Sequence, residues 1–157
     1  MPGPVRYLED MTAGETIEVG SYTVSEEEIL DFARRYDPQP FHLDAEAGKT
    51  THFGGLVASG WHTAGIMMRM MVDEILSPET SLGSPGIDEL RWLKPVRPGD
   101  TLRLRFTTLE VRRSRSRPEM GTVRQRMEVL NQYDEVVMSM LGIGMVRART
   151  LPEGGSP

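Results

Sequence analysis

The sequence predicts an α+β protein in which an antiparallel β-sheet wraps around one long helix. The stretch from about Ser59 to Leu76 is apolar on most faces, which is typical of a helix in the middle of a structure. Four later segments alternate with a period of two, as antiparallel strands do. Turn sequences rich in Pro, Gly, Asn and Asp separate these segments. A twisted sheet packed on the buried helix satisfies both patterns.

The N-terminal third predicts one strand and one helix. Residues 16–24 alternate well enough to form a first strand. Ser25 and Glu28 have the spacing of a capping box, so a helix is expected to begin there and to end near Tyr36. Residues 44–49 are expected to add one helical turn, and residues 53–57 to form a glycine-bearing loop.

The remaining elements follow in order along the chain. The long helix is expected to begin after Ser59 and to end before Ser77-Pro78. Strands are expected at 87–92, 101–111, 122–130 and 136–147. Residues 1–150 therefore form a single predicted domain, and residues 151–157 a flexible C-terminal tail.

Composition limits the classes of function. With 38% hydrophobic and 26% charged residues and no long apolar run, the 157-residue chain is expected to be a soluble domain without a membrane span. The N-terminus lacks a signal-peptide pattern, so a cytoplasmic location is expected.

Cysteine is absent, which excludes disulfides and thiolate chemistry. The net charge of −5 disfavours nucleic acid as a partner. The arginines from Arg112 to Arg117 could hold phosphates, but a solvated rim is the favoured interpretation.

The segment from Asp37 to His42, with the sequence DPQPFH, carries the most chemical information. Two prolines stiffen the backbone and stop the preceding helix. A carboxylate beside an imidazole on such a loop suits general acid–base catalysis, because histidine side chains titrate near neutral pH. A helix-stopping turn with an ordinary hydrogen-bonded histidine explains the same residues, and the segment alone leaves both interpretations open.

The start of the long helix offers a complementary group. Ser59 is a plausible N-cap, and Gly60 lies in the first turn, where backbone N–H groups have no partner within the helix. Such a terminus can stabilise a negative charge developing on a carbonyl oxygen. Ordinary capping and tight packing explain these residues equally well when they are taken alone.

Together these segments resemble a known family. The sequence DPQPFH is similar to the Asp-x-Asn-Pro-x-His motif of MaoC-like dehydratases and (R)-specific enoyl-CoA hydratases. The resemblance continues through three further segments, which are Phe53-Gly54-Gly55, Val57-Ala58-Ser59-Gly60 and Leu93 to Thr101. It spans about residues 15–147, which is most of the chain.

The resemblance implies a hotdog fold, a homodimer or dimer of dimers, an acyl-CoA thioester substrate and a role in fatty acid metabolism. Asp37 and His42 would activate the water that adds to an enoyl thioester, and the Gly60 N–H would polarise the thioester carbonyl. The supporting or substrate-binding residues it implies are Gln39, Pro40, Phe41, Ser59 and Trp61. Coenzyme A would enter only as part of the substrate, and no other cofactor is implied.

The sequence departs from the family pattern at two positions and has a bulky residue at a third. Gln39 replaces the typical Asn and is one methylene longer. Met68 lies where some relatives have a serine, which leaves the hydrogen bonding behind the catalytic pair open. Trp61 would narrow the acyl tunnel, so short or unusual acyl groups are expected.

Three functions follow from these residues. The first is hydration of enoyl thioesters by Asp37 and His42. The second is a hotdog thioesterase, which is disfavoured because Asp73 and Glu74 lie too far along the helix to act as its carboxylate. The third is a non-catalytic acyl-CoA-binding module. No metal site is expected, because the three histidines and Asp44 do not match a standard ligand spacing.

Overall fold

The computed structural model describes residues 2–152, so residues 153–157 of the tail predicted at 151–157 lie outside the described residues. Among the described residues the order of elements is η1 (Leu8–Asp10), β1 (Thr16–Thr23), α1 (Glu26–Tyr36), α2 (Pro40–Leu43), α3 (Ala45–Lys49), α4 (Gly60–Glu74), β2 (Gly86–Trp92), β3 (Thr101–Arg113), β4 (Met120–Leu130) and β5 (Val136–Arg147). The sequence predicted the strands and the long helix at these places and missed the short elements η1 and α2.

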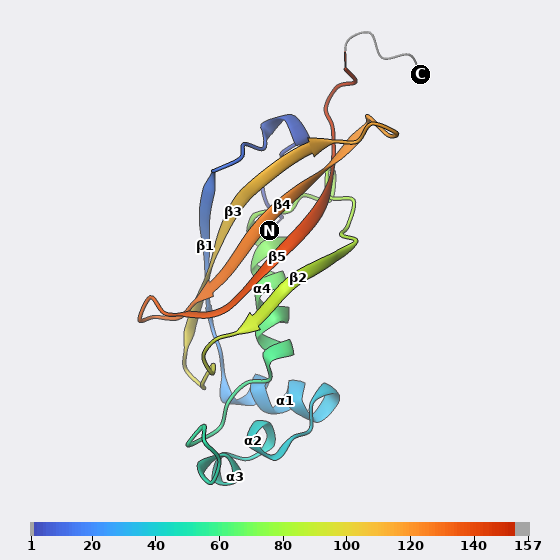
Figure 1. The fold of residues 1–157 in the computed structure, drawn as a ribbon. Coiled ribbons are helices and arrows are strands. Elements are labelled where there is room, and N and C mark those ends of the chain that lie inside the picture. Colours follow the sequence, from blue (N-terminus) through green and yellow to red (C-terminus); the bar gives the residue numbers. More distant parts are fainter. Residues whose placement is uncertain (1, 153–157) are drawn as a thin grey trace.

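The five strands form one antiparallel sheet in the order β1-β3-β4-β5-β2. The sheet curves across α4, and α1, α2 and α3 gather at the end of the molecule where α4 begins (Figure 1). β3, β4 and β5 are joined by short connections, which explains their neighbouring positions. This architecture confirms the predicted α+β fold class.

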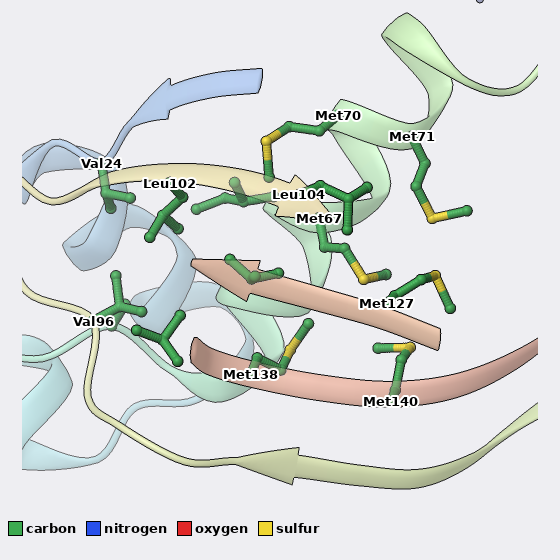
Figure 2. Packing of buried hydrophobic residues seen from close by; sticks show 14 of the residues in the cluster. Val24, Met67, Met70, Met71, Val96, Leu102, Leu104, Met127, Met138 and Met140 are labelled. Atoms are coloured by element: carbon green, nitrogen blue, oxygen red, sulfur yellow. The ribbon is translucent and has the colours of Figure 1, made fainter. Parts of the chain in front are cut away.

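The core lies between α4 and the inner face of the sheet. Leu104 on β3, Val129 on β4 and Met138 on β5 are completely buried. They face a methionine-rich side of α4 that includes Met67 and Met70 (Figure 2). Buried residues alternate along β3 and β4 with partly or fully exposed ones, as expected for a sheet covered on one face.

The predicted near-complete burial of α4 is wrong for the single chain. The sheet covers one side of the helix, so His62, Thr63, Ile66, Met67, Met70 and Met71 are buried. Three apolar side chains on the other side remain exposed, Trp61 to 58%, Met68 to 48% and Val72 to 45%. One sheet can cover only one face of a helix. Because α4 is apolar on most faces, its second apolar face stays uncovered in the single chain.

The arginine-rich hairpin between β3 and β4 has a structural role. Arg113 donates hydrogen bonds of 2.7 Å to the carbonyls of Pro118 and Thr150, and the Arg117 Nε lies 3.0 Å from a carboxylate oxygen of Glu119. These contacts agree with the favoured interpretation of a solvated rim. Within the described part of the chain, no helix has both the length and the apolar character needed to cross a membrane.

Candidate active site

Asp37 and His42 are positioned by the change from α1 to α2. The N–H of Asp37 still bonds to the Ala33 carbonyl, and Pro38 then prevents the helix from continuing. Gln39 is extended, with φ −86° and ψ 145°, and Pro40 is the first residue of α2. The sequence predicted only a stiff loop here. A helical turn forms because proline is accepted at the first helical position, where its missing N–H costs nothing.

The backbone around Val57 ties α2 to the rest of the site. The Val57 N–H donates to the Phe41 carbonyl at 3.1 Å, and the Val57 carbonyl accepts from Nδ1 of His42 at 2.7 Å. Next to it, the Ala58 N–H donates to the Val96 carbonyl at 2.8 Å. Both Val57 and the His42 side chain are buried. These directional bonds fix the imidazole ring in one orientation.

The hydrogen bond to Val57 also sets the tautomer of His42. A carbonyl can only accept, so Nδ1 carries the hydrogen and neutral His42 presents a lone pair at Nε2. This Nε2 lies 3.3 Å from Oδ2 of Asp37. Two proton acceptors therefore face each other at a distance that is long for a hydrogen bond. Such an arrangement can hold one water molecule that donates one O–H to each.

Two hydrogen bonds keep the Asp37 carboxylate in place. The Ser59 hydroxyl donates to Oδ2 and the Gln39 amide donates to Oδ1, each at 2.7 Å. Burial alone would raise the pKa of the Asp37 carboxyl, but the hydrogen bonds from Ser59 and Gln39 oppose it, and the pKa lies below its usual value. Asp37 is thus ionised at neutral pH. The longer Gln39 side chain does reach the carboxylate.

Ser59 differs from its predicted role as a side-chain cap. It occupies the N-cap position of α4, but its hydroxyl makes no capping hydrogen bond. Instead it donates to Asp37, 22 residues earlier in the chain. Because its side chain is completely buried, the carboxylate is the partner that satisfies it. Ser59 thus links the start of α4 directly to the acid–base pair.

Gly60 combines a close packing contact with an available backbone donor. Trp92 packs so tightly over it that a Cβ at position 60 would lie 2.4 Å from the indole ring. The Trp92 Nε1 donates to the Gly60 carbonyl at 3.0 Å. The Gly60 N–H makes no hydrogen bond to any residue that the structure describes. It is the first N–H of α4, at the positive end of the helix dipole.

These groups meet in a cavity of about 430 Å³. Six of the residues singled out from the sequence line it, namely Asp37, Gln39, Phe41, His42, Gly60 and Trp61. Pro40 and Ser59 position the lining residues from behind. The Phe41 ring packs edge-on against His42 with centroids 4.5 Å apart, and Trp61 packs edge-on against Trp92 at 5.1 Å. Much of the remaining wall is apolar, so a ligand here would be largely shielded from water.

Sequence reasoning missed several residues of this cavity. Trp92 and Lys94 come from the end of β2 and the turn after it, and Thr63 comes from the second turn of α4. No local pattern marks Trp92, because its role depends on β2 lying beside the start of α4. Thr63 could have been found, since it lies within one helical turn of Gly60 on the predicted helix.

Other residues considered from the sequence lie away from the acid–base pair. Met68, which left the hydrogen bonding behind the pair open, lies on the exposed side of α4 and does not line this cavity; the Ser59 hydroxyl is the group that bonds to Asp37. His62 faces α1, with Nε2 3.3 Å from Glu28 and its ring stacked on Phe32. Burial lowers the pKa of His62 against the opposing effect of Glu28. Across residues 2–152 there is no cluster of three or more His, Cys, Asp or Glu able to hold a metal ion.

A family model and a solved structure point to the same family. The family model described as "MaoC like domain" matches residues 10–130. A solved MaoC-like dehydratase from Rhodospirillum rubrum is 40% identical with a TM-score of 0.87, and the match covers 94% of this chain and all of that chain.

A curated relative and a second structure extend the comparison. The mesaconyl-CoA hydratase of Cereibacter sphaeroides is 34% identical over 157 residues, which cover 92% of this chain but only 42% of the relative. A Mycobacterium tuberculosis protein described as having a double hotdog fold is 19% identical with a TM-score of 0.74, covering 99% of this chain and 46% of that one. The latter likeness concerns the fold alone, and the fold of this chain is a hotdog.

Replacing Ser59 by alanine should raise the pKa of the Asp37 carboxyl, because the hydrogen bond that the Ser59 hydroxyl donates to Oδ2 of Asp37 is lost. In the wild type this depressed pKa stabilises the fold above the pKa of the unfolded chain, and the stabilisation disappears as pH falls through the folded pKa. The variant should therefore be less stable near neutral pH and approach the wild type in acid. Carbon-13 NMR titration and urea unfolding at several pH values measure both effects. Ser114→Ala, in the distant hairpin, is the matched control, and an unchanged Asp37 pKa in Ser59→Ala would contradict the assignment.

Proposed function

The chain belongs to the MaoC-like domain family, a family of hydratases and dehydratases, and from that premise we propose that it adds water to enoyl thioesters and reverses this reaction on 3-hydroxyacyl thioesters. The proposed carrier is coenzyme A. The observation that carries the proposal is the convergence of Nε2 of His42 and Oδ2 of Asp37, 3.3 Å apart, on one largely apolar cavity.

In the hydration direction the pair holds the water. One O–H points to Nε2 of His42 and the other to Oδ2 of Asp37, since both atoms accept. As one of these groups takes a proton, the hydroxyl adds to the β-carbon of the enoyl thioester. The electron pair of the double bond moves toward the thioester carbonyl and gives an enolate. A protonated member of the pair then delivers the proton to the α-carbon, so that one water is consumed and no redox partner is needed.

The developing enolate oxygen needs a donor. The Gly60 N–H is unpaired among the described residues, faces the same cavity and lies at the positive end of α4. Ser59 connects this residue to Asp37, which keeps the oxyanion donor and the water-holding pair in a fixed relation. The stabilisation of the enolate and the activation of water thus act on one bound thioester.

Thioester hydrolysis finds less support in the site. Of the residues of α4, only Gly60, Trp61 and Thr63 line the cavity, so the helix contributes no carboxylate. Asp73 and Glu74 lie at its far end, about 20 Å from Gly60 at 1.5 Å per residue. A water held by Asp37 and His42 is the nucleophile that the cavity offers.

We further propose that two copies of the chain associate through the uncovered face of α4. Trp61, Met68 and Val72 on α4 and Ile87 on the edge strand β2 are between 45% and 58% exposed. Exposed apolar side chains grouped beside a free sheet edge are typical of a subunit interface. A homodimer, or a dimer of dimers, would bury them.

Asp37→Asn and His42→Ala should each lower the hydration rate of enoyl-CoA by roughly 10²–10⁴-fold, because each removes one of the two proton acceptors. Loss of the ultraviolet absorbance of the conjugated enoyl thioester measures hydration, and thiol release from saturated acyl-CoA is followed in parallel. Both variants should keep the wild-type fold by circular dichroism. A hydration rate at the wild-type level in either variant would contradict the mechanism. Thiol release without hydration would favour the thioesterase.

A pair of variants at Gly60 isolates the backbone donor. In a Trp92→Ala background, which removes the steric conflict, Gly60→Ala keeps the N–H and Gly60→Pro deletes it. Proline fits the first helical position, and Ser59 already has the extended angles, φ −57° and ψ 139°, that precede proline. The proline variant should be about 10²–10³-fold slower than its alanine partner. Equal hydration rates in the two variants would show that a group other than the Gly60 N–H stabilises the enolate oxygen.

Val72→Glu should convert the associated protein to a single chain, because a charge would be forced into the apolar interface. Analytical ultracentrifugation measures the mass in solution. Val5→Glu, at another exposed apolar position, is the control and should leave the mass unchanged. A wild-type protein that sediments as a single chain at high concentration would disprove the proposed interface.

A further inference from the structure

A second cavity of about 330 Å³ lies between α4 and the inner face of the sheet. Its wall is mainly apolar and includes Met67 and Met71 on α4, Met127 on β4 and Met140 on β5 (Figure 2). Methionine side chains are flexible and polarisable, so they adapt to ligands of different shapes. A cavity of this size can hold part of a small molecule.

One residue of this wall does not fit an apolar lining. Gln125 occupies a core-facing position of β4, between Val123 and Met127, and is only 7% exposed. Its amide makes no hydrogen bond to another residue in the described part of the chain. Asn131, a comparably buried amide at the end of the strand, bonds through both its nitrogen and its oxygen. Because Gln125 lines the cavity, a molecule bound there can supply the hydrogen-bond partner that the chain itself does not.

The opposing strand leaves room for that partner. Gln125 pairs with Gly142 in the register of β4 and β5, and Gly144 follows two residues later on the same face. Both glycines line the cavity, and a Cβ at Gly144 would lie 3.4 Å from Nε2 of Gln125. The Met127 side chain fills the space over Gly142, where a Cβ would lie 2.4 Å from its terminal methyl, whereas Gly144 leaves room beside the Gln125 amide on the cavity side.

The second cavity lies beyond the first along two elements, and no described residue lines both. Thr63 lines the first and Met67 the second, and residues four apart lie on the same face of a helix. On β5, Val137 lines the first cavity and Met140 the second. Met67 lies about 10 Å along α4 from Gly60, at 1.5 Å per residue. An acyl chain whose carbonyl lies at Gly60 and which extends along α4 therefore points toward the second cavity.

We infer that the second cavity binds the distal part of the acyl chain, and that the Gln125 amide hydrogen-bonds an uncharged oxygen, a hydroxyl or a carbonyl, carried on that chain. The inference rests on the proposed function, because it takes an acyl thioester as the ligand. It goes beyond that function by assigning a chemical preference at a distance from the reacting carbons.

The charges of the wall favour a neutral oxygen over a carboxylate. Arg6 is the one charged residue that lines this cavity. Its guanidinium forms an ion pair with Glu15 at 2.7 Å and donates to the Asp10 carbonyl at 2.9 Å. A ligand carboxylate would therefore be buried opposite an already neutralised cation, which is unfavourable. An amide can donate to or accept from a neutral oxygen without that penalty.

Calorimetric titration with saturated acyl-CoAs tests the inference, because these ligands bind without being hydrated. At each chain length the methyl-terminated, hydroxyl-terminated and carboxylate-terminated forms are compared on the wild type and on Gln125→Met, which keeps the length of the side chain and removes the amide. The advantage of the hydroxyl over the methyl form should fall roughly tenfold in Gln125→Met. Gln125→Leu is a second apolar replacement, and Arg126→Met, on the opposite face of β4, is the matched control and should keep the wild-type ratio.

The outcomes separate this inference from the proposed function. A hydroxyl-to-methyl ratio that does not change in either Gln125 variant, binding of neither form, or strongest binding of the carboxylate form would overturn the inference. Hydration of enoyl-CoA is assayed on the same preparations. Hydration with an unchanged ratio refutes the second-cavity inference alone, and a ratio that falls as expected in a protein without hydration activity refutes the proposed function alone.

Discussion

The hydrogen bond from His42 to the Val57 carbonyl is the interaction on which the rest of the site depends. It joins α2 to the segment that leads into α4, and it determines which imidazole nitrogen faces the cavity. In the other neutral tautomer, an N–H at Nε2 instead of a lone pair would meet Asp37. The carbonyl is itself fixed, because Val57 is buried and its own N–H is bonded to Phe41. The tautomer is therefore a consequence of the fold.

The carboxylate is balanced between two opposing effects. Burial disfavours its charge, and the hydrogen bonds from Ser59 and Gln39 restore it. Because both oxygens already accept a strong hydrogen bond, Asp37 is a well-oriented acceptor with limited basicity, while His42 has a free lone pair at Nε2. Water held between them therefore meets one acceptor whose oxygens are already hydrogen-bonded and one with a free lone pair. This difference between the two acceptors suits a reaction in which a proton is first removed and then returned.

Much of this arrangement could be predicted from the sequence, because it depends on short-range rules. The prolines around Gln39 explain why α1 ends at Tyr36, and the period-two pattern located the strands. The hydroxyl of Ser59 could not be assigned, since its partner lies 22 residues away and serine at a helix start usually caps. Trp92 was missed for the same reason, as its contact with Gly60 exists only once β2 lies beside α4. Gln125 lies within the strand predicted at 122–130, but the sequence could not show that Gly142 and Gly144 lie opposite it beside a cavity.

The two ends of the interior are built on different physical principles. Around Asp37 and His42, directional hydrogen bonds from buried backbone and side-chain groups hold each atom in one place. Farther along α4, methionines form a wall whose shape can adjust, with dispersion contacts that depend little on direction. A ligand's tail can thus displace side chains at the far end without disturbing the acid–base pair, because no hydrogen bond of Asp37 or His42 passes through the methionine wall. In the ligand arrangement that we infer, the Gln125 amide adds a directional requirement to this wall, so it discriminates among tails while the reacting atoms keep one geometry.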